Sequence, residues 1–228
     1  MIENNIHQIW VGPYEIPRRE KMFIQKNKEI NNSFNFYLWT DDNLPKLPKN
    51  IQEIVDFHRK NENYVEISDV LRLYLIKEYG GIYLDIDSEP ISSFDINLID
   101  HDLFVCYHDN NPFDFTIPNE AIASKKNSNI INYICDSIDI KKCTGYHQYW
   151  LAEIIRKYLG LNEQLWNQNS NITSNNDVKR LAKERNIEYF SYIKFQTFFI
   201  HRRLLSGETS NKEKFKNGDI NYTENRGW

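Results

Sequence analysis

The sequence is poor in the features that mark several common classes of protein. Three of its 228 residues are cysteine and none forms a Cys-x-x-Cys pair, so neither a disulfide framework nor a cysteine zinc site is indicated. No apolar run approaches the roughly 20 residues that a membrane-spanning helix needs. The net charge of −4 argues against a general nucleic-acid-binding protein. We therefore expect a protein of a reducing compartment with no nucleic-acid partner.

Internal repeats and low-complexity linkers that would divide the chain are also missing. With 228 residues, 40% hydrophobic and 14% aromatic, the chain is long enough to bury one sizeable core. Its first residues carry neither the positive cluster nor the apolar block of a signal peptide. We expect one domain spanning residues 1–228 and located in the cytoplasm. The alternative is a protein that also contacts a membrane surface peripherally.

The pattern of apolar residues predicts an α/β fold with a mostly parallel central sheet. The opening reads as strand, helix, strand, and such units place their functional loops at the carboxyl ends of the strands. The expected strands cover 5–11, 34–39, 102–108 and 187–193, with one more that starts at 82 and ends at Pro90. The expected helices cover 18–30, 49–60, 66–79, 128–137, 147–159 and 177–186, with a helix start at 118–123.

The stretch from Glu66 to Pro90 places charged side chains at the ends of two consecutive elements. Asp69 and Arg72 are three residues apart on the predicted helix, so their side chains are neighbours. Gly80-Gly81 then end the helix, because glycine enters the left-handed conformation at little cost. The alternative for Asp69 and Arg72 is an ordinary surface ion pair, which contributes a few tenths of a kcal/mol.

The strand that follows ends in an Asp-x-Asp pattern. Tyr83, Asp85 and Asp87 alternate with apolar residues and therefore share one face of the strand. Two carboxylates this close repel each other unless a cation lies between them. Mg²⁺ and Mn²⁺ take one or two carboxylates and fill their other positions with water and phosphate oxygens, which suits a diphosphate substrate. The alternative is a solvated acidic turn.

Two segments resemble the core signature of the family 32 glycosyltransferases: Ser68-Asp69-Val70-Leu71-Arg72 and the run from Tyr79 to Asp87. This DXD sugar-binding group includes fungal initiating mannosyltransferases and bacterial capsule enzymes, and it is similar to the glucosyltransferase domains of large clostridial toxins. The resemblance implies a GT-A fold and a metal-dependent, retaining transfer of a hexose. The donor would be a UDP- or GDP-sugar, and the acceptor a saccharide, a glycolipid or a protein.

The resemblance also implies roles for the charged residues. Asp87 would bind Mn²⁺ (or Mg²⁺) directly, and Asp85 would bind it through water or hold the ribose and sugar hydroxyls. The metal would neutralise charge on the leaving nucleoside diphosphate. Asp69 and Arg72 would grip the donor sugar, and Tyr83 would contribute to the donor site. No residue can be named as a covalent nucleophile, so front-face transfer is the expected route.

Three further candidates follow from the same resemblance. Trp10 ends the family's first strand and would stack on the nucleotide base, with a place in the core as its alternative. The segment Asn119-Glu120-Ala121 resembles the family's Asn-x-Ala segment and would bind sugar hydroxyls, while a helix N-cap is the alternative for Asn119. Family members commonly end in a Ser-Trp that reaches the diphosphate, and Trp228 or Ser206 would take this part here.

On this interpretation residues 1–108 form the nucleotide-sugar and metal-binding half. Residues 109–228 form the acceptor-side half, with the C-terminal tail over the site.

Two other classes of protein remain as alternatives. One is a non-catalytic nucleotide-sugar or glycan-binding module of the same fold. The other is a phosphatase of the haloacid dehalogenase type, against which Glu89 and the late Gly218-Asp219 argue.

Overall fold

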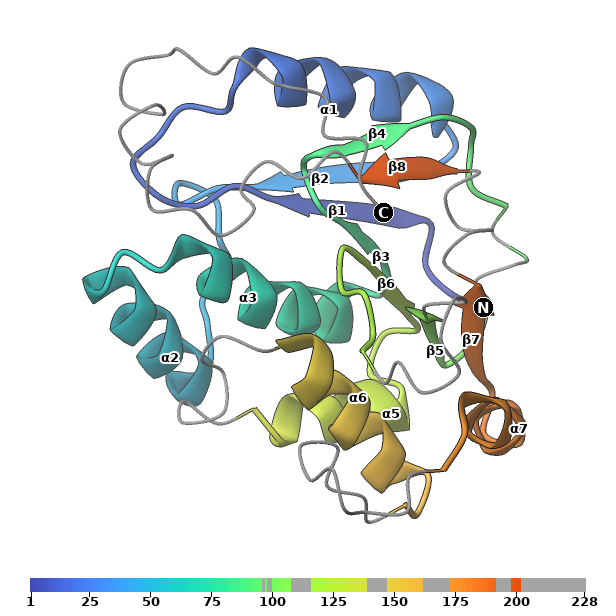
Figure 1. The fold of residues 1–228 in the computed structure, drawn as a ribbon. Helices are drawn as coiled ribbons and strands as arrows, with labels where there is room; N and C mark the ends of the chain where they lie inside the picture. Colours follow the sequence, from blue (N-terminus) through green and yellow to red (C-terminus); the bar gives the residue numbers. More distant parts are fainter. Residues whose placement is uncertain are drawn as a thin grey trace.

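The computed structural model describes residues 1–95, 97, 100–107, 116–138, 147–161, 173–191 and 198–201. Within these ranges six strands form one sheet in the order β2-β1-β3-β6-β5-β7, and β4 and β8 form a second, two-stranded sheet (Figure 1). The strands are β1 (Asn5–Ile9), β2 (Asn35–Trp39), β3 (Gly81–Leu84), β4 (Ser88–Pro90), β5 (Leu103–Tyr107), β6 (Ala121–Ser124), β7 (Ile187–Ser191) and β8 (Phe199–His201). The helices are α1 (Arg18–Ile30), α2 (Lys49–Lys60), α3 (Tyr64–Tyr79), α5 (Asn129–Asp136), α6 (His147–Tyr158) and α7 (Asn175–Lys183).

The central sheet is mostly parallel, as predicted. β1 pairs in parallel with β2 and β3, and β5 pairs in parallel with β7. β6 lies between β3 and β5 and is antiparallel to both. The carboxyl ends of the parallel strands therefore meet at one edge of the sheet, and β6 begins at that same edge.

Alternation along the strands separates the buried side chains into two cores. In β3, Ile82 and Leu84 face one core and Tyr83 faces the other. In β6, Ile122 faces the Tyr83 side and its alanine neighbours face away. Figure 1 shows α2, α3, α5 and α6 on one side of the sheet, with α1, β4 and β8 on the other. This two-sided covering explains why β3 is buried along its whole length.

The structure confirms most of the predicted elements. Helices α1 and α2 have the predicted bounds, 18–30 and 49–60, and each follows a proline that takes the N-cap position, Pro17 and Pro48. Helices α3, α5, α6 and α7 and strands β1, β2, β5 and β7 agree with their predicted ranges to within a few residues at each end. Strand β8 was not predicted, and β4 was expected as the end of one strand with β3. Strand β3 is shorter than expected, because it ends at Leu84 before the Asp-x-Asp residues.

The prediction of a helix start at residues 118–123 is wrong. Residues 121–124 form β6, which pairs with β3 on one side and with β5 on the other. The alternative of a helix N-cap for Asn119 is wrong for the same reason, since a strand follows it. Alanine and glutamate favour helices, but pairing on both edges overrides this local preference.

Within the described ranges, the model contains no helix that is both long and apolar enough to cross a bilayer.

Candidate functional site

The predicted site residues gather at the carboxyl edge of the central sheet. Trp10 follows β1 and Asp85 follows β3, and these two strands are parallel neighbours. Asn119 and Glu120 lead into β6 beside β3. The backbone N–H of Asp85 donates to the carbonyl of Glu120 at 2.8 Å, so the segments before β6 and after β3 are directly joined.

Two glycines connect helix α3 to this edge. Gly80 has φ 65° and Gly81 has φ 105°, both in the region that disfavours residues with a side chain. A β-carbon on Gly81 would lie 2.4 Å from the backbone oxygen of Asn5 in the neighbouring β1. Glycine is thus required both by the turn and by the close approach of β1, and it lets the helix run straight into the strand.

Arg72 connects three segments of the site. Its Nη2 lies 2.6 Å from Asp69 Oδ1 on the same helix and 3.3 Å from Asp85 Oδ1 after β3. Its Nη1 donates to the carbonyl of Asn119 before β6, and its Nε donates to the carbonyl of Ser68 at 3.3 Å. The Asn119 amide in turn donates to Asp69 Oδ1 at 2.9 Å. The guanidinium therefore fixes the relative positions of Asp69, Asp85 and Asn119.

The Asp69–Arg72 pair is buried, so the alternative of a surface ion pair is wrong. Asp69 is 8% exposed and Arg72 is 4% exposed. Burial alone would lower the pKa of Arg72, but the negative charges of Asp69, Asp85 and Glu120 raise it above its ordinary value. Arg72 therefore stays positively charged. The contacts of its guanidinium described above are all with other groups of the protein.

Tyr83 holds the first aspartate of the motif from inside the sheet. Its hydroxyl donates to Asp85 Oδ1 at 2.6 Å and lies 3.2 Å from the Ser68 hydroxyl. The guanidinium carbon of Arg72 lies 4.4 Å from the centre of the Tyr83 ring. Burial, together with the charge of Asp85, raises the pKa of Tyr83 well above 10.0, so the phenol stays a hydrogen-bond donor. Tyr83 and Arg72 thus converge on one carboxylate oxygen.

Asp87 is 6% exposed, so the alternative of a solvated acidic turn is wrong for this residue. It lies directly before β4, where Ser88 pairs with His201 of β8. This pairing brings a segment from late in the chain against the residue that follows the motif. Trp228 and Ser206, which we expect to serve the diphosphate, lie outside the described residues.

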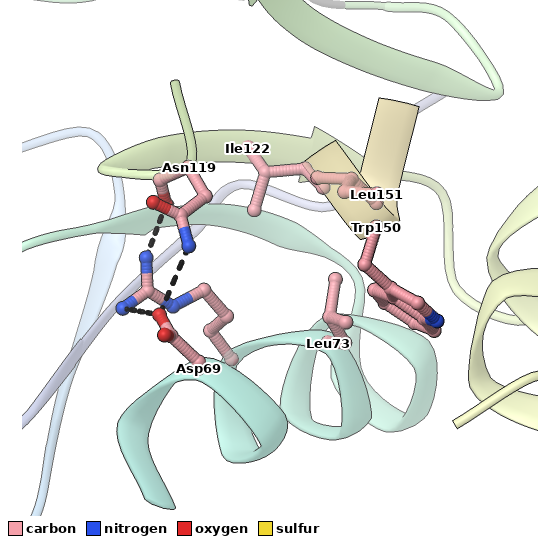
Figure 2. A pocket seen from close by; sticks show the side chains of 7 residues that line it. Asp69, Leu73, Asn119, Ile122, Trp150 and Leu151 are labelled. Carbon is pink, nitrogen blue, oxygen red and sulfur yellow. Dashed lines mark hydrogen bonds and ion pairs between the residues drawn. The ribbon is translucent and has the colours of Figure 1, made fainter. Parts of the chain in front are cut away.

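A small pocket opens beside the Asp69–Asn119 contact. It contains about 230 Å³ of empty space, part of it continuous with solvent, and its lining also includes Arg72. Figure 2 shows the polar end of the pocket formed by Asp69 and Asn119, and an apolar wall that lies opposite. Leu73 of α3, Ile122 of β6, and Trp150 and Leu151 of α6 make up this wall. A pocket with one polar end and one apolar wall suits a small ligand that carries hydroxyl groups.

The chemistry of the motif fits a divalent cation. Asp85 and Asp87 offer carboxylate oxygens, the donor type that Mg²⁺ and Mn²⁺ prefer. In the described part of the chain, no three His, Cys, Asp or Glu side chains are close enough together to hold an ion. Two carboxylates suffice for a small hard cation that keeps several waters and binds phosphate oxygens. A bound cation would supply positive charge next to a departing diphosphate.

Trp10 lies at the predicted edge but is held by the protein. Its indole Nε1 donates to the carbonyl of Tyr14 at 2.7 Å, and its backbone N–H donates to the carbonyl of Trp39 at 2.8 Å. The residue is half-buried rather than part of the core, so its alternative as a core residue is wrong. An indole fixed in this way presents a ring whose orientation is set in advance.

Sequence reasoning missed two residues near the site. Trp150 of α6 lines the pocket and is 7% exposed. Its position depends on how α6 packs, and no sequence signal indicates it. Glu20 is fully buried, although the pattern does contain a signal, since Glu20 stands three and four residues before the buried Phe23 and Ile24.

Comparison with known proteins agrees with this geometry. Residues 17–105 match the model of the glycosyltransferase sugar-binding region containing a DXD motif. The matched stretch contains Asp69, Arg72, Asp85 and Asp87. A glycosyltransferase of Acanthamoeba polyphaga mimivirus is 30% identical over 145 residues, which cover 62% of this chain and 57% of the viral protein. The chain thus spans little more than half the length of this DXD relative.

Two solved structures share the fold. PaToxG glycosyltransferase superposes with a TM-score of 0.54 at 18% identity, over 80% of this chain and 84% of that chain. The catalytic domain of alpha-toxin from Clostridium novyi superposes with a TM-score of 0.52 at 11% identity, over 95% of this chain and 82% of that chain. These matches confirm the predicted GT-A fold and the resemblance to clostridial toxin domains.

Proposed function

We propose that the protein is a glycosyltransferase that moves a hexose from a nucleotide sugar to a saccharide, glycolipid or protein acceptor. The observation that carries the proposal is the connected cluster of Asp69, Arg72, Asp85 and Asn119, in which the Asp69–Arg72 pair is buried. It lies beside Asp87 at the carboxyl edge of the sheet, the usual ligand edge of such folds. The match of residues 17–105 to the DXD sugar-binding region supports the same activity.

In this proposal Asp87 holds Mn²⁺ or Mg²⁺ directly. Asp85 faces the metal or the ribose, and Arg72 holds it in place. Asp69 and the Asn119 amide face the donor sugar, and Trp10 faces the base. Residues 1–108 serve the donor, and residues 109–228 serve the acceptor. The resemblance to the family 32 glycosyltransferases implies that the anomeric configuration is retained. Because no residue has been assigned as a covalent nucleophile, the proposed transfer follows a front-face route.

The donor and the metal can be tested in one experiment. The protein is incubated with UDP- and GDP-sugars, with and without Mn²⁺, and the released nucleoside diphosphate is measured. The isosteric variant Asp87→Asn removes the carboxylate charge, and Asp56→Asn, on the exposed face of α2, removes the same charge away from the site. We expect release from one donor that requires Mn²⁺ and is lost by at least about 100-fold in Asp87→Asn alone, the size of effect typical for a lost electrostatic contact to the transition state.

Release by the Asp87→Asn variant at the rate of the Asp56→Asn control would contradict the proposed metal role. No release from any donor, with no metal-dependent nucleotide binding by calorimetry, would favour the non-catalytic binding module of the same fold.

A further inference from the structure

Glu20 is a buried carboxylate that the proposed roles above do not use. It lies in the first turn of α1, and its side chain is 0% exposed. Oε1 accepts a hydrogen bond from Arg19 Nε at 2.7 Å, and Arg19 Nη2 lies 2.6 Å from the same oxygen. The other oxygen, Oε2, has no hydrogen-bond partner among the described residues. A buried carboxylate oxygen without a donor is costly, so it indicates a missing partner.

The surroundings of Glu20 contain the second aspartate of the DXD motif. Helix α1 packs against β4, the strand that starts directly after Asp87 (Figure 1). Lys26 Nζ of α1 lies 3.6 Å from Glu89 Oε1 of β4, which fixes the two elements together. Burial raises the pKa of Glu20, Arg19 lowers it, and the negative charge of Asp87 adds to the increase. Glu20 and Asp87 are therefore both buried, and they lie close enough for their charges to interact where α1 packs against β4.

We propose that Glu20 is a further acidic residue of the cation site, placed behind Asp87, whose Oε2 accepts a hydrogen bond from a water molecule on the bound cation. The inference rests on the proposed function, because the cation is the one that the DXD pair would hold. Mg²⁺ and Mn²⁺ retain several waters, and acceptors that bind such waters tune metal affinity. A cation here also offsets the repulsion between the carboxylates of Asp87 and Glu20.

A purely structural role is the rival explanation. A negative charge is favourable in the first turn of a helix, and Glu20 orients the guanidinium of Arg19, whose carbon lies 5.5 Å from the centre of the Phe23 ring. This role gives Glu20 no influence on cation binding. The two explanations therefore differ in a property that can be measured without any turnover.

The test measures binding of Mn²⁺ alone by calorimetry, together with the melting temperature of the metal-free protein. Glu20→Gln keeps the size of the side chain and removes its charge. Glu29→Gln, exposed on the same helix, is the matched control. We expect Glu20→Gln to weaken Mn²⁺ binding by at least about 10-fold, the usual loss for a ligand's supporting acceptor. Its metal-free melting temperature should be equal to or above that of the wild type, because the repulsion with Asp87 is gone.

Mn²⁺ affinity in Glu20→Gln equal to that of the Glu29→Gln control would overturn the inference while leaving the proposed metal dependence intact. Absence of Mn²⁺ binding in the wild type itself would instead reject both. If Glu20→Gln does not fold, Arg19→Gln decides the question, since it keeps the carboxylate and removes its partner. Mn²⁺ affinity above the wild-type level in Arg19→Gln supports the inference, because the carboxylate charge is then no longer offset by Arg19, and affinity equal to or below the wild-type level overturns it.

Discussion

Arg72 and Asp69 show how single side chains hold the site together. The guanidinium contacts groups from α3, from the turn after β3 and from the segment before β6. Asp69 Oδ1 accepts from both Arg72 and the Asn119 amide. Because the pair is buried, removing one partner leaves the other charge without full compensation, which costs more than the pair itself contributes.

We predict that Asp69→Asn destabilises the fold by about 3 kcal/mol, the lower part of the range for a broken buried ion pair, because Asp85 still faces Arg72. Urea unfolding of the wild type and the variant measures the change. The double variant Asp69→Asn/Arg72→Met serves as the comparison, since it removes the uncompensated charge as well. It should recover part of the stability but none of the donor turnover.

If Asp69→Asn is as stable as the wild type, water must reach Arg72 and compensate its charge. That result would contradict the burial of Arg72 described here. A double variant that restores turnover together with stability would show that the pair supports the fold and not the donor site.

At the scale of elements, the junction of α3 and β3 positions the DXD residues. The helix ends at Tyr79, and two glycines with positive φ lead directly into the strand beside β1. Gly160, at the end of the α6 segment, also has positive φ but has no atom within 4 Å of an added β-carbon. The two positions therefore share backbone strain and differ in steric contact.

We predict that Gly81→Ala is more destabilising than Gly160→Ala. Both variants force alanine to positive φ, which costs about 1 to 3 kcal/mol. In Gly81→Ala the new β-carbon also meets the Asn5 backbone oxygen at 2.4 Å, so β1 must shift away from β3. Chemical denaturation of both variants gives the difference. If both variants lose the same free energy of unfolding, β1 must shift at little cost. Steric contact with Asn5 would then not explain why residue 81 is glycine.

Most elements could be predicted from the sequence because their signals are local. The bounds of α1 and α2 follow from amphipathic runs that start after Pro17 and Pro48. Strand β6 could not be predicted, since its residues resemble a helix start and its conformation is set by pairing with β3 and β5. Pairing partners distant in sequence leave no trace in a short window.

The same distinction applies to the candidate site. Asp69, Arg72, Asp85 and Asp87 could be named in advance because they lie within one short stretch of sequence with a recognisable spacing. The contact of Arg72 with the Asn119 carbonyl could not be predicted from the sequence, because it joins residues 47 positions apart. The burial of Glu20 beside the DXD turn likewise depends on how α1 packs on β4.

At the scale of the whole molecule, His7 joins three parts of the fold. Its Nε2 donates to the Gly80 carbonyl at the α3–β3 junction at 2.8 Å, and its Nδ1 accepts from Trp39 Nε1 of β2 at 3.1 Å. This pair of contacts requires the neutral ring. The side chain is fully buried, and burial lowers its pKa from 6.5 to about 4, although the bond to Gly80 opposes the change.

We predict that His7 makes the fold less stable as the pH falls from 6.5 towards 4. In this window the unfolded chain binds a proton at His7 that the folded protein does not, so the free energy of unfolding decreases with decreasing pH. The difference of about 2.5 pH units between 6.5 and 4, at about 1.4 kcal/mol each, amounts to roughly 3 to 4 kcal/mol. Below pH 4 the folded protein also binds the proton, and the dependence on this residue ends.

The contribution of His7 can be separated from that of the carboxylates by two measurements. Proton NMR of the imidazole rings should show that His7 stays neutral down to about pH 4 in the folded protein. The slope of unfolding free energy against pH between 4 and 6.5 should be smaller in His7→Gln, which keeps a donor for Gly80 but does not titrate. A His7 ring that titrates near 6.5 in the folded state would mean that water reaches the junction, and that the α3–β3 connection opens more readily than its packing indicates.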